Sequence, residues 1–381
     1  MKKILFINGH LKVGGCEKSL LDVLNHFDYS RYQVDLLLLE EGDDYLTYLN
    51  RNVRVIRYPL EHAFGSFFDV VKSSVKNKDW FSLRFRLIHN FAVRISLKFY
   101  RKARRLFLKL RNEYDVIVSY RPGICSILAA FAFSSKRRIT WWHHGEYTEY
   151  YGAEPSFAKM DYLVCVSKSS ADIVMEHYPQ FCKKIRVIPN MIDSNDVVSL
   201  SKEIAESKQG PFCIVTVGRM SPEKNIAFCV EIAKNLLNKG VVFKWTIIGD
   251  GEDYDKVSRL IIDEKLDDYI LLTGRLENPY PIVRNSDVLV HPSLVESQGI
   301  TVLEAMALSV PVIVVDSAGP REYIQNMENG IILKPDAECF ADAIYRIFTG
   351  EINTEEMIEK AVKTVQNYSP CAIIKQIEDL L

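Results

Sequence analysis

The sequence lacks any long uninterrupted apolar run, although 48% of its 381 residues are hydrophobic. A helix that spans a bilayer needs roughly 18 or more predominantly apolar residues in a row, so we expect no spanning helix. The apolar run that opens the chain stops at Asn8-Gly9-His10, which is too early for the hydrophobic region of a signal peptide. This run therefore predicts a first strand.

The sequence also lacks paired cysteines. Its eight cysteines include no Cys-x-x-Cys pair and no cluster with the spacing of a metal site. Cys165 and Cys213 lie in apolar, strand-like runs, where a free cysteine packs as a small hydrophobic residue. We therefore expect reduced thiols, as in a cytoplasmic protein, and no bound metal ion.

The chain has almost no net charge, at −1, but one segment is strongly basic. Between Lys72 and Arg111 thirteen lysines and arginines stand against a single acid, Asp79. They alternate with apolar residues in a segment, residues 61–112, that we expect to be helical throughout. Such a surface fits an anionic membrane, but a solvated helix that covers its own domain has the same pattern. A basic surface can also bind nucleic acid. Because no nucleic-acid-binding motif accompanies this segment, we do not expect a nucleic acid as a partner.

Length and periodicity predict two α/β domains. A chain of 381 residues fits two domains of roughly 150 to 200 residues. Short apolar runs alternate with amphipathic helical segments, which is typical of parallel sheets. The stretch Ile188–Asp193 and the polar residues 194–211 predict the linker, and a new strand begins at Phe212.

The stretch from His291 to Asp316 predicts one βαβ unit, in which two apolar strands flank a short helix. A loop that feeds a helix N-terminus at the carboxyl end of a parallel strand offers free N–H groups to an anion. Glu296 in the loop and Glu304 in the helix are placed to flank such a ligand and to bind neutral hydroxyls at its two ends. The spacing fits equally well with Glu296 as a helix cap and Glu304 as a solvated residue.

Arg219 and Lys224 form a second candidate group, after the strand that opens the second domain. We expect Ser221 to cap, and Pro222 to open, a helix that runs through Leu237. Two cations at a strand end and helix start bind phosphates by charge-assisted hydrogen bonds, each worth roughly 1.5 to 3 kcal/mol. An arginine and a lysine taken alone are also common as solvated surface residues.

The first domain holds two further candidate positions. Gly14 and Gly15 separate the first strand from a helix and allow either close backbone approach to a ligand or a plain tight turn. Their spacing is not that of a dinucleotide-binding loop. His143 and His144 end an apolar strand, and because alternate side chains point to opposite faces, at most one of them faces a site. No further ligands with metal-site spacing accompany them.

These residues stand in motifs that resemble the retaining glycosyltransferase family 4, which has the GT-B fold. Glu296 and Glu304, in the setting PSxxESxGxxxLEAMAxxxPVI, look like the Glu-x7-Glu signature of that family. The sequences GRxxxxK at Arg219, GGxE at Gly14 and IPNxxD at the linker also match. One departure is Ser309, where the family usually has glycine. The resemblance covers nearly the whole chain and is weakest in the insertion.

The resemblance implies a GT-B architecture of two Rossmann-like α/β domains facing each other across a cleft. It implies transfer of a sugar from a nucleotide diphosphate sugar, first of all a UDP-sugar, to an acceptor hydroxyl, with retained anomeric configuration and without a metal or cofactor. The residues that it assigns to catalysis are Glu296, Arg219, Lys224 and His144, with His143 as the fallback. The residues that it assigns to donor binding are Gly14, Gly15, Arg275, Gly299, Ile300, Thr301 and Glu304.

The same resemblance implies individual roles. Glu296 is expected to hold the sugar hydroxyls, Glu304 the ribose hydroxyls, and a donor phosphate oxygen to accept the proton of the acceptor. Asp253 and Asp255 also fit the Asp-x-Asp motif of metal-dependent transferases with the GT-A fold. We expect them instead to open a surface helix, where acids favour the helix dipole.

The domains and partners expected are as follows. Residues 1–193, with the insertion 61–112 and a returning C-terminal helix 369–381, bind the acceptor, and residues 194–368 bind the nucleotide sugar. The acceptor is a glycan or lipid-linked glycan of cell-surface polysaccharide synthesis. We expect the protein to be cytoplasmic and to lie at the inner face of the cell membrane, with residues 72–111 as the candidate contact to the membrane. Two alternatives share the fold: a nucleotide-sugar epimerase and a non-catalytic partner subunit.

Overall fold

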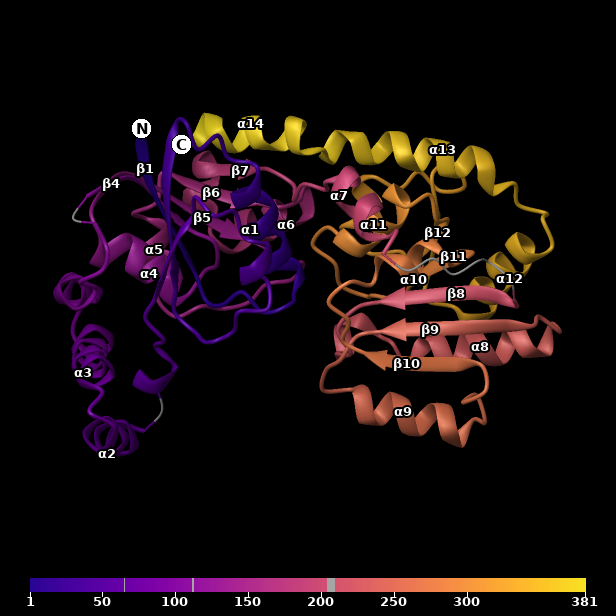
Figure 1. Cartoon of the computed structure of the whole chain (residues 1–381), viewed down its shortest axis with the longest axis horizontal. Coiled ribbons are helices and arrows are strands. Elements are labelled where there is room, and N and C mark those ends of the chain that lie inside the picture. Colours follow the sequence, from indigo (N-terminus) through magenta and orange to yellow (C-terminus); the bar gives the residue numbers. More distant parts are fainter. Residues whose placement is uncertain (65, 112, 204–209) are drawn as a thin grey trace. The chain divides into compact units, whose positions relative to one another are not determined.

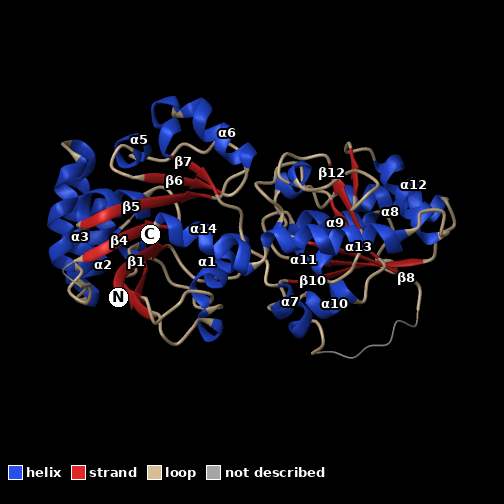
Figure 2. Ribbon diagram, turned by 90° about the horizontal axis from the view of Figure 1, so that it is seen from above, coloured by secondary structure: helices blue, strands red, loops and turns tan. Residues whose placement is uncertain are grey.

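The computed structural model describes residues 1–64, 66–111, 113–203 and 210–381, and the chain forms two compact units (Figure 1). The first unit comprises Met1–Pro189 together with Ile374–Leu381, and the second comprises Asn190–Ile373. Each unit is built around one parallel sheet, as the alternation of strands and helices predicts (Figure 2).

The first unit contains a seven-stranded parallel sheet in the order β3-β2-β1-β4-β5-β6-β7. One of its inner strands, β1, carries the apolar run Ile4–Ile7, which is completely buried because helices and loops cover both faces of the sheet. The strands are β1 (Lys2–Asn8), β2 (Tyr32–Leu38), β3 (Arg54–Arg57), β4 (Tyr114–Ser119), β5 (Ser135–Trp142), β6 (Tyr162–Cys165) and β7 (Ile185–Val187).

The helices of the first unit follow the expected pattern. In the first of them, the apolar side chains of Leu20, Leu21 and Leu24 are buried. The α-helices are α1 (Gly15–Asn25), α2 (Phe67–Asn77), α3 (Trp80–Arg94), α4 (Ile124–Ile127), α5 (Ala153–Phe157), α6 (Lys168–His177) and α14 (Pro370–Leu380), the last of which continues from the second unit.

The basic insertion is mostly, but not throughout, helical. It contains α2, α3, a short 3₁₀ turn and the ten-residue 3₁₀ helix η3 (Leu97–Leu106), after which Phe107–Leu110 form turns. The inner side chains Phe85, Tyr100 and Phe107 are fully buried in the same apolar cluster as the sheet. The inner face of the insertion therefore covers its own domain.

The second unit contains a six-stranded parallel sheet in the order β10-β9-β8-β11-β12-β13. The predicted βαβ unit is present as β11, α11 and β12. The strands are β8 (Phe212–Val217), β9 (Phe243–Ile248), β10 (Ile270–Gly274), β11 (Val288–His291), β12 (Val312–Val315) and β13 (Ile331–Leu333). The helices are α7 (Ser194–Leu200), α8 (Phe228–Asn238), α9 (Tyr254–Asp263), α10 (Tyr280–Arg284), α11 (Ile300–Ala307), α12 (Ala337–Phe348) and α13 (Thr354–Val365).

Part of the predicted linker is a helix: Ser194–Leu200 form α7, while the boundary between the units falls within residues 188–193. Asp193 caps a helix, α7, by accepting hydrogen bonds from the N–H groups of Asn195 and Asp196, at 3.0 and 3.2 Å. Val197 of this helix is buried in the core of the second unit. Residues 204–209 of the predicted linker lie outside the described residues.

The helix expected from Pro222 through Leu237 also begins later than predicted. Pro222–Lys224 form one 3₁₀ turn, η6, and Asn225 then takes a left-handed φ of 53°. The hydroxyl of Ser221 donates to the carboxylate of Glu223 at 2.6 Å instead of capping a helix. Asparagine tolerates the left-handed conformation, so the chain turns here before α8 starts.

None of the helices within the described ranges combines the length and the apolar composition of a transmembrane segment. All eight cysteines are free thiols. The C-terminal residues contact the first sheet: Arg31 forms an ion pair with Glu378 at 3.0 Å, and Arg137 donates to the carbonyl of Leu380 at 2.7 Å.

Candidate active site

The candidate site of the second unit lies where the strand order of its sheet reverses. Strands β8 and β11 are neighbours at the centre of the sheet, and the chain leaves them toward opposite edges. Ligands of open α/β sheets bind beyond the carboxyl ends of strands at such a switch point. The loop after β8 carries Arg219 and Lys224, and the loop after β11 carries Glu296.

Glu296 is buried and is held by two partners through one oxygen. Lys224 Nζ lies 2.5 Å from Glu296 Oε1, and His291 Nε2 lies 2.8 Å from the same atom. The side chain of Lys224 is 24% exposed, so its ammonium reaches the site from a partly open loop. The structure therefore brings together two of the predicted site residues and adds His291, the last residue of β11.

The pair of partners keeps Glu296 ionised. Burial alone would raise the pKa of this carboxyl, but the charge of Lys224 and the hydrogen bonds from His291 and Lys224 hold the pKa far below its usual range. The other ring nitrogen of His291, Nδ1, is buried without a hydrogen-bond partner among the described residues. Donation from Nε2 to the carboxylate thus fixes the orientation of this ring.

Backbone contacts tie the two loops together. Leu294 N–H donates to the carbonyl of Glu223 at 2.9 Å, and Ser293 Oγ donates to the same carbonyl at 3.3 Å. Further along, the side-chain amide of Gln298 accepts from Asn190 N–H at 2.7 Å and donates to its carbonyl at 3.1 Å. The loop that carries Glu296 is therefore anchored at both ends.

Gly299, Ile300 and Thr301 form the start of α11, as predicted. Gly299 has a φ of 83°, a left-handed conformation that glycine adopts without strain, and it lies at the N-cap position. The first N–H groups of a helix have no partner within the helix, so this turn presents donors and the positive end of the dipole. No side chain caps α11, which excludes Glu296 as its cap.

Glu304 is buried on α11, which excludes the alternative that it is a solvated residue. Its Oε1 accepts a hydrogen bond from the hydroxyl of Tyr280 at 2.7 Å. Tyr280 opens α10, and it was not expected from the sequence at the site. A carboxylate with four lone-pair positions retains acceptors for further donors, such as hydroxyls of a ligand.

Arg219 projects from the first loop as an exposed side chain that forms no ion pair with any residue in the described ranges. Two glycines shape the backbone beneath it: a Cβ at Gly249 would lie 1.8 Å from the carbonyl oxygen of Gly218, and one at Gly251 would lie 2.3 Å from that of Met220. The loop after β9 therefore packs directly against the loop that carries Arg219.

Two other sequence predictions fall on the surface of this unit. Arg275 directly follows β10 and is exposed. Asp253 and Asp255 lie at the start of α9, with Asp253 at the N-cap and Asp255 in the first turn. This helix-opening position is the one expected for the two acids.

In the first unit, the loop with Gly14 and Gly15 leads into α1 and places Glu17 against Arg121. The carboxylate of Glu17 forms an ion pair with the guanidinium of Arg121, which follows β4. His10 Nδ1 lies 3.7 Å from Oε1 of the same carboxylate. A Cβ at Gly14 would lie 2.7 Å from Glu17 Oε2, so the absence of a side chain there serves this packing. His10 and Arg121 were missed from the sequence, because nothing in their local pattern distinguishes them.

His144 and His143 lie beyond β5 and differ in their partners. His144 Nε2 lies 2.6 Å from the hydroxyl of Tyr150, while the ring of His143 packs on Tyr120 with 4.8 Å between centroids. Burial, together with the charge of Arg121, lowers the pKa of His144. His144 is therefore neutral at pH 7 and able to exchange hydrogen bonds with a polar ligand.

Both halves of the chain match families of known proteins. Residues 13–196 match the family described as Glycosyltransferase Family 4, and residues 199–364 match the family described as Glycosyl transferases group 1.

Individual relatives are distant. An uncharacterized glycosyltransferase of Methanocaldococcus jannaschii is 28% identical over 227 residues, which are 58% of this chain and 56% of that protein. This chain thus spans little more than half the length of that relative. The Escherichia coli UDP-Gal:alpha-D-GlcNAc-diphosphoundecaprenol alpha-1,3-galactosyltransferase is 25% identical over 296 residues, which are 71% of this chain and 76% of that enzyme.

Among solved structures, Staphylococcus aureus TarM in complex with Fondaparinux, alpha-GlcNAc-glycerol and UDP aligns with a TM-score of 0.75 and 16% identity, over 100% of this chain and 99% of that one. The two parallel-sheet units define an α/β protein of the GT-B class. The chain thus combines a Glycosyltransferase Family 4 domain, residues 13–196, with a Glycosyl transferases group 1 domain, residues 199–364.

Proposed function

We propose that the protein is a retaining glycosyltransferase that moves a sugar from a UDP-sugar to a hydroxyl of a glycan or lipid-linked glycan in cell-surface polysaccharide synthesis. The observation that carries the proposal is the buried contact of Glu296 with Lys224 and His291 at the switch point of the second sheet. We assign the nucleotide sugar to the second unit and the acceptor to the first.

The chemistry follows from the charge that develops on the leaving diphosphate. Donors that are already in place where negative charge appears lower the barrier to its departure. Arg219, Lys224 and the N–H groups of Gly299–Thr301 are the proposed donors. With these positive groups the proposal requires neither a metal ion nor a cofactor.

The remaining candidates bind the neutral parts of the donor. Glu296, kept ionised by its partners, accepts hydrogen bonds from hydroxyls of the sugar, and Glu304 accepts from the ribose. Arg275 is proposed to lie near the nucleobase. A phosphate oxygen of the donor takes the proton of the attacking hydroxyl, so no side chain is assigned as a base.

The first unit is proposed to contribute His144 to binding of the sugar, and Gly14 and Gly15 to the approach of the donor. The neutral ring of His144 is both a donor and an acceptor, which suits a hydroxyl.

The choice of uridine rests on the names of similar proteins. The similar Escherichia coli enzyme is named for UDP-Gal and for a diphosphoundecaprenol acceptor, and the similar Staphylococcus aureus structure contains UDP. A lipid-linked acceptor, together with the basic segment 72–111, supports peripheral attachment at the inner face of the cell membrane. Nucleic acid is not among the proposed partners.

A nucleotide-sugar epimerase and a non-catalytic partner subunit are the alternative functions. An epimerase would release isomers of the free sugar without any acceptor, and a non-catalytic subunit would bind without turnover. The mass of the product formed from a bound nucleotide sugar separates these outcomes.

The direct test compares donor hydrolysis and transfer by the wild type and by Arg219→Ala, Lys224→Ala and Glu296→Ala. Each substitution is expected to lower turnover, whereas Arg259→Ala, which removes an exposed cation from α9, serves as the control. Full activity in all three site variants would contradict the proposal.

A further inference from the structure

The outward side of α3 carries large apolar side chains and cations on one stripe. Trp80, Leu87, Phe91 and Ile95 are 53%, 41%, 52% and 65% exposed. Their spacing of seven, four and four residues places them on the same side of a helix, with Ile95 at its C-terminal cap. The stripe also includes the exposed cations Arg84 and Arg94. We call these six residues the outer face.

The neighbouring helix η3 adds further positively charged side chains beside the outer face. It packs beside α3 and exposes Lys98, Arg101, Lys102 and Arg105. None of these four, nor Arg84 or Arg94, forms an ion pair with a residue of the described ranges, so their charge is available to a partner.

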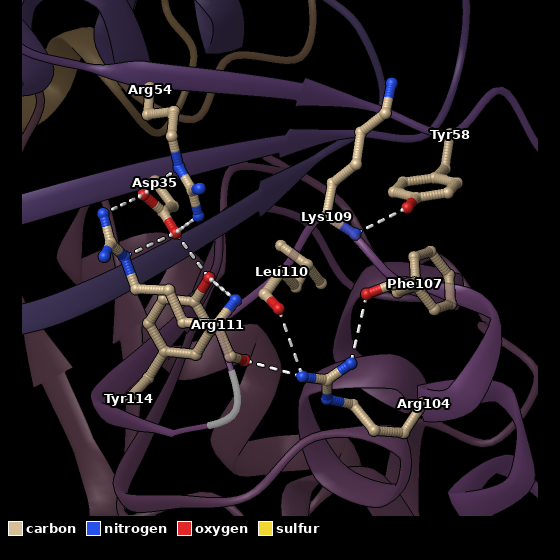
Figure 3. Close-up of polar contacts among 9 residues, drawn as sticks. All are labelled: Asp35, Arg54, Tyr58, Arg104, Phe107, Lys109, Leu110, Arg111 and Tyr114. Carbon is tan, nitrogen blue, oxygen red and sulfur yellow. Dashed lines mark hydrogen bonds and ion pairs between the residues drawn. The ribbon is translucent and has the colours of Figure 1, made fainter.

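The outer face is supported by a rigid base that uses other residues. Arg104 donates to the backbone carbonyls of Phe107, Leu110 and Arg111, at 3.1, 3.3 and 2.7 Å, and closes the turn after η3 (Figure 3). The side chain of Arg111 in turn donates to the fully buried Asp35 of β2 at 3.1 Å. The insertion is thus fixed to the sheet by residues other than those of the outer face.

We propose that the outer face docks the protein on an anionic lipid bilayer. Aromatic and aliphatic side chains that alternate with cations on one helix side suit the boundary between head groups and acyl chains. Cations near such a surface each strengthen binding by attraction to anionic lipids. A nucleic acid would interact with the cations through its phosphates and would leave the apolar side chains of Leu87 and Ile95 exposed to water. The inference builds on the proposed lipid-linked acceptor, but its test uses no transfer reaction.

Trp80 provides a direct probe of docking. The other three tryptophans, Trp141, Trp142 and Trp245, are at most 3% exposed, so a change in the surroundings of Trp80 dominates any shift in emission. The expected result is a blue shift on addition of vesicles of phosphatidylcholine mixed with phosphatidylglycerol. The shift is expected to be absent with phosphatidylcholine alone, absent in Trp80→Phe, and lost at high salt, where the screening length falls from about 10 Å at 0.1 M to about 3 Å at 1 M.

Two sets of variants separate charge from apolar contact. Vesicle co-sedimentation is expected to weaken about 100-fold when three cations are removed together, in Arg84→Gln, Arg94→Gln and Arg101→Gln. It is also expected to weaken at least about tenfold in the triple variant Leu87→Ser, Phe91→Ser and Ile95→Ser. The matched controls, which should bind as the wild type does, remove exposed residues of the second unit: Lys256→Gln, Arg259→Gln and Lys363→Gln for charge, and Val242→Ser, Ile262→Ser and Leu271→Ser for apolar contact.

The readout is independent of the proposed transfer function, because UDP affinity is measured separately on every variant. Vesicle binding that falls in both insertion variants while UDP affinity is unchanged supports docking through the outer face. Equal binding to neutral and anionic vesicles, or binding that neither insertion variant weakens, would overturn it. Preferential binding of a single-stranded RNA oligonucleotide over anionic vesicles would overturn it as well.

Discussion

Lys224 Nζ lies 2.5 Å from Glu296 Oε1, so the cation proposed for the diphosphate is held by the carboxylate proposed for the sugar. An ammonium has three donors and can therefore keep this contact while it donates to a phosphate. The bond proposed to break joins the sugar to the diphosphate, and this ion pair connects the residue proposed for the sugar with the residue proposed for the diphosphate. Loss of either partner is expected to affect both nucleotide binding and turnover.

Lys224→Ala is expected to weaken UDP binding by roughly 10- to 100-fold, the loss of one charge-assisted hydrogen bond worth about 1.5 to 3 kcal/mol. Calorimetric titration with UDP measures the change. Lys234→Ala is the control, because Lys234 pairs with Glu264 on the surface of the same unit. UDP affinity that is equal in Lys224→Ala and in the control would rule out contact between Lys224 and the diphosphate.

His291 is expected to act as a positioning residue for Glu296. His291→Phe removes the hydrogen bond to Oε1 and should lower kcat about 10- to 100-fold, with little change in UDP affinity. His291→Gln places an amide N–H near the position of Nε2 and should recover part of the loss. A purely structural role predicts instead that the two variants lose activity in proportion to their loss of stability.

His143 is expected to make the protein less stable in mild acid. Burial lowers the pKa of His143 to about 3, below the value of about 6.5 in an unfolded chain. Between these two pH values His143 binds a proton in the unfolded state but not in the folded state. The free energy of unfolding is therefore highest above pH 6.5 and decreases as the pH falls toward 3. The slope is about 1 kcal/mol for each pH unit.

Urea unfolding between pH 4 and pH 6.5 measures this slope. His143→Phe, which keeps a ring against Tyr120, should flatten it, while the same substitution at the exposed His62 should not. An unchanged slope in His143→Phe would show that the imidazole of His143 remains accessible to protons.

Ser309→Gly is expected to stabilise the protein by about 1 kcal/mol. Ser309 follows the end of α11 with a left-handed φ of 62°, and Val310 N–H closes the turn on the carbonyl of Ala305 at 3.0 Å. Glycine adopts this conformation without the strain of a side chain. Ser199→Gly in the exposed part of α7 is the opposite control, since glycine within a helix costs about 0.5 kcal/mol. Thermal unfolding that shows no gain for Ser309→Gly would contradict this account of the turn.

Much of the fold follows from the sequence, because its signals are local. Alternating apolar runs and amphipathic helices predict both parallel sheets, and the strand, loop, helix and strand around Glu296 are confirmed. The start of α8 is not predictable in the same way. The helix starts late because Asn225 takes a left-handed backbone conformation and because the hydroxyl of Ser221 donates to Glu223 instead of capping the helix.

The candidate site was only partly predictable. Glu296 and Lys224 are 72 residues apart, and local patterns cannot place one against the other. His291 stands directly before the Pro-Ser of the motif, so its position was a usable signal, whereas its contact with Glu296 depends on the path of the loop. Tyr280 beside Glu304 lies on a different helix and carries no sequence signal at all.

The proposed sugar transfer is tested most directly by incubating the protein with a panel of nucleotide sugars and glycan acceptors. The release of UDP and the mass of the sugar product are then measured. We expect that at least one UDP-sugar is consumed with transfer of its sugar, and that Glu296→Gln lowers this rate about 100-fold or more. The surface variant Glu264→Gln should turn over as the wild type does. Consumption of no UDP-sugar, or an unchanged rate in Glu296→Gln, would contradict the account.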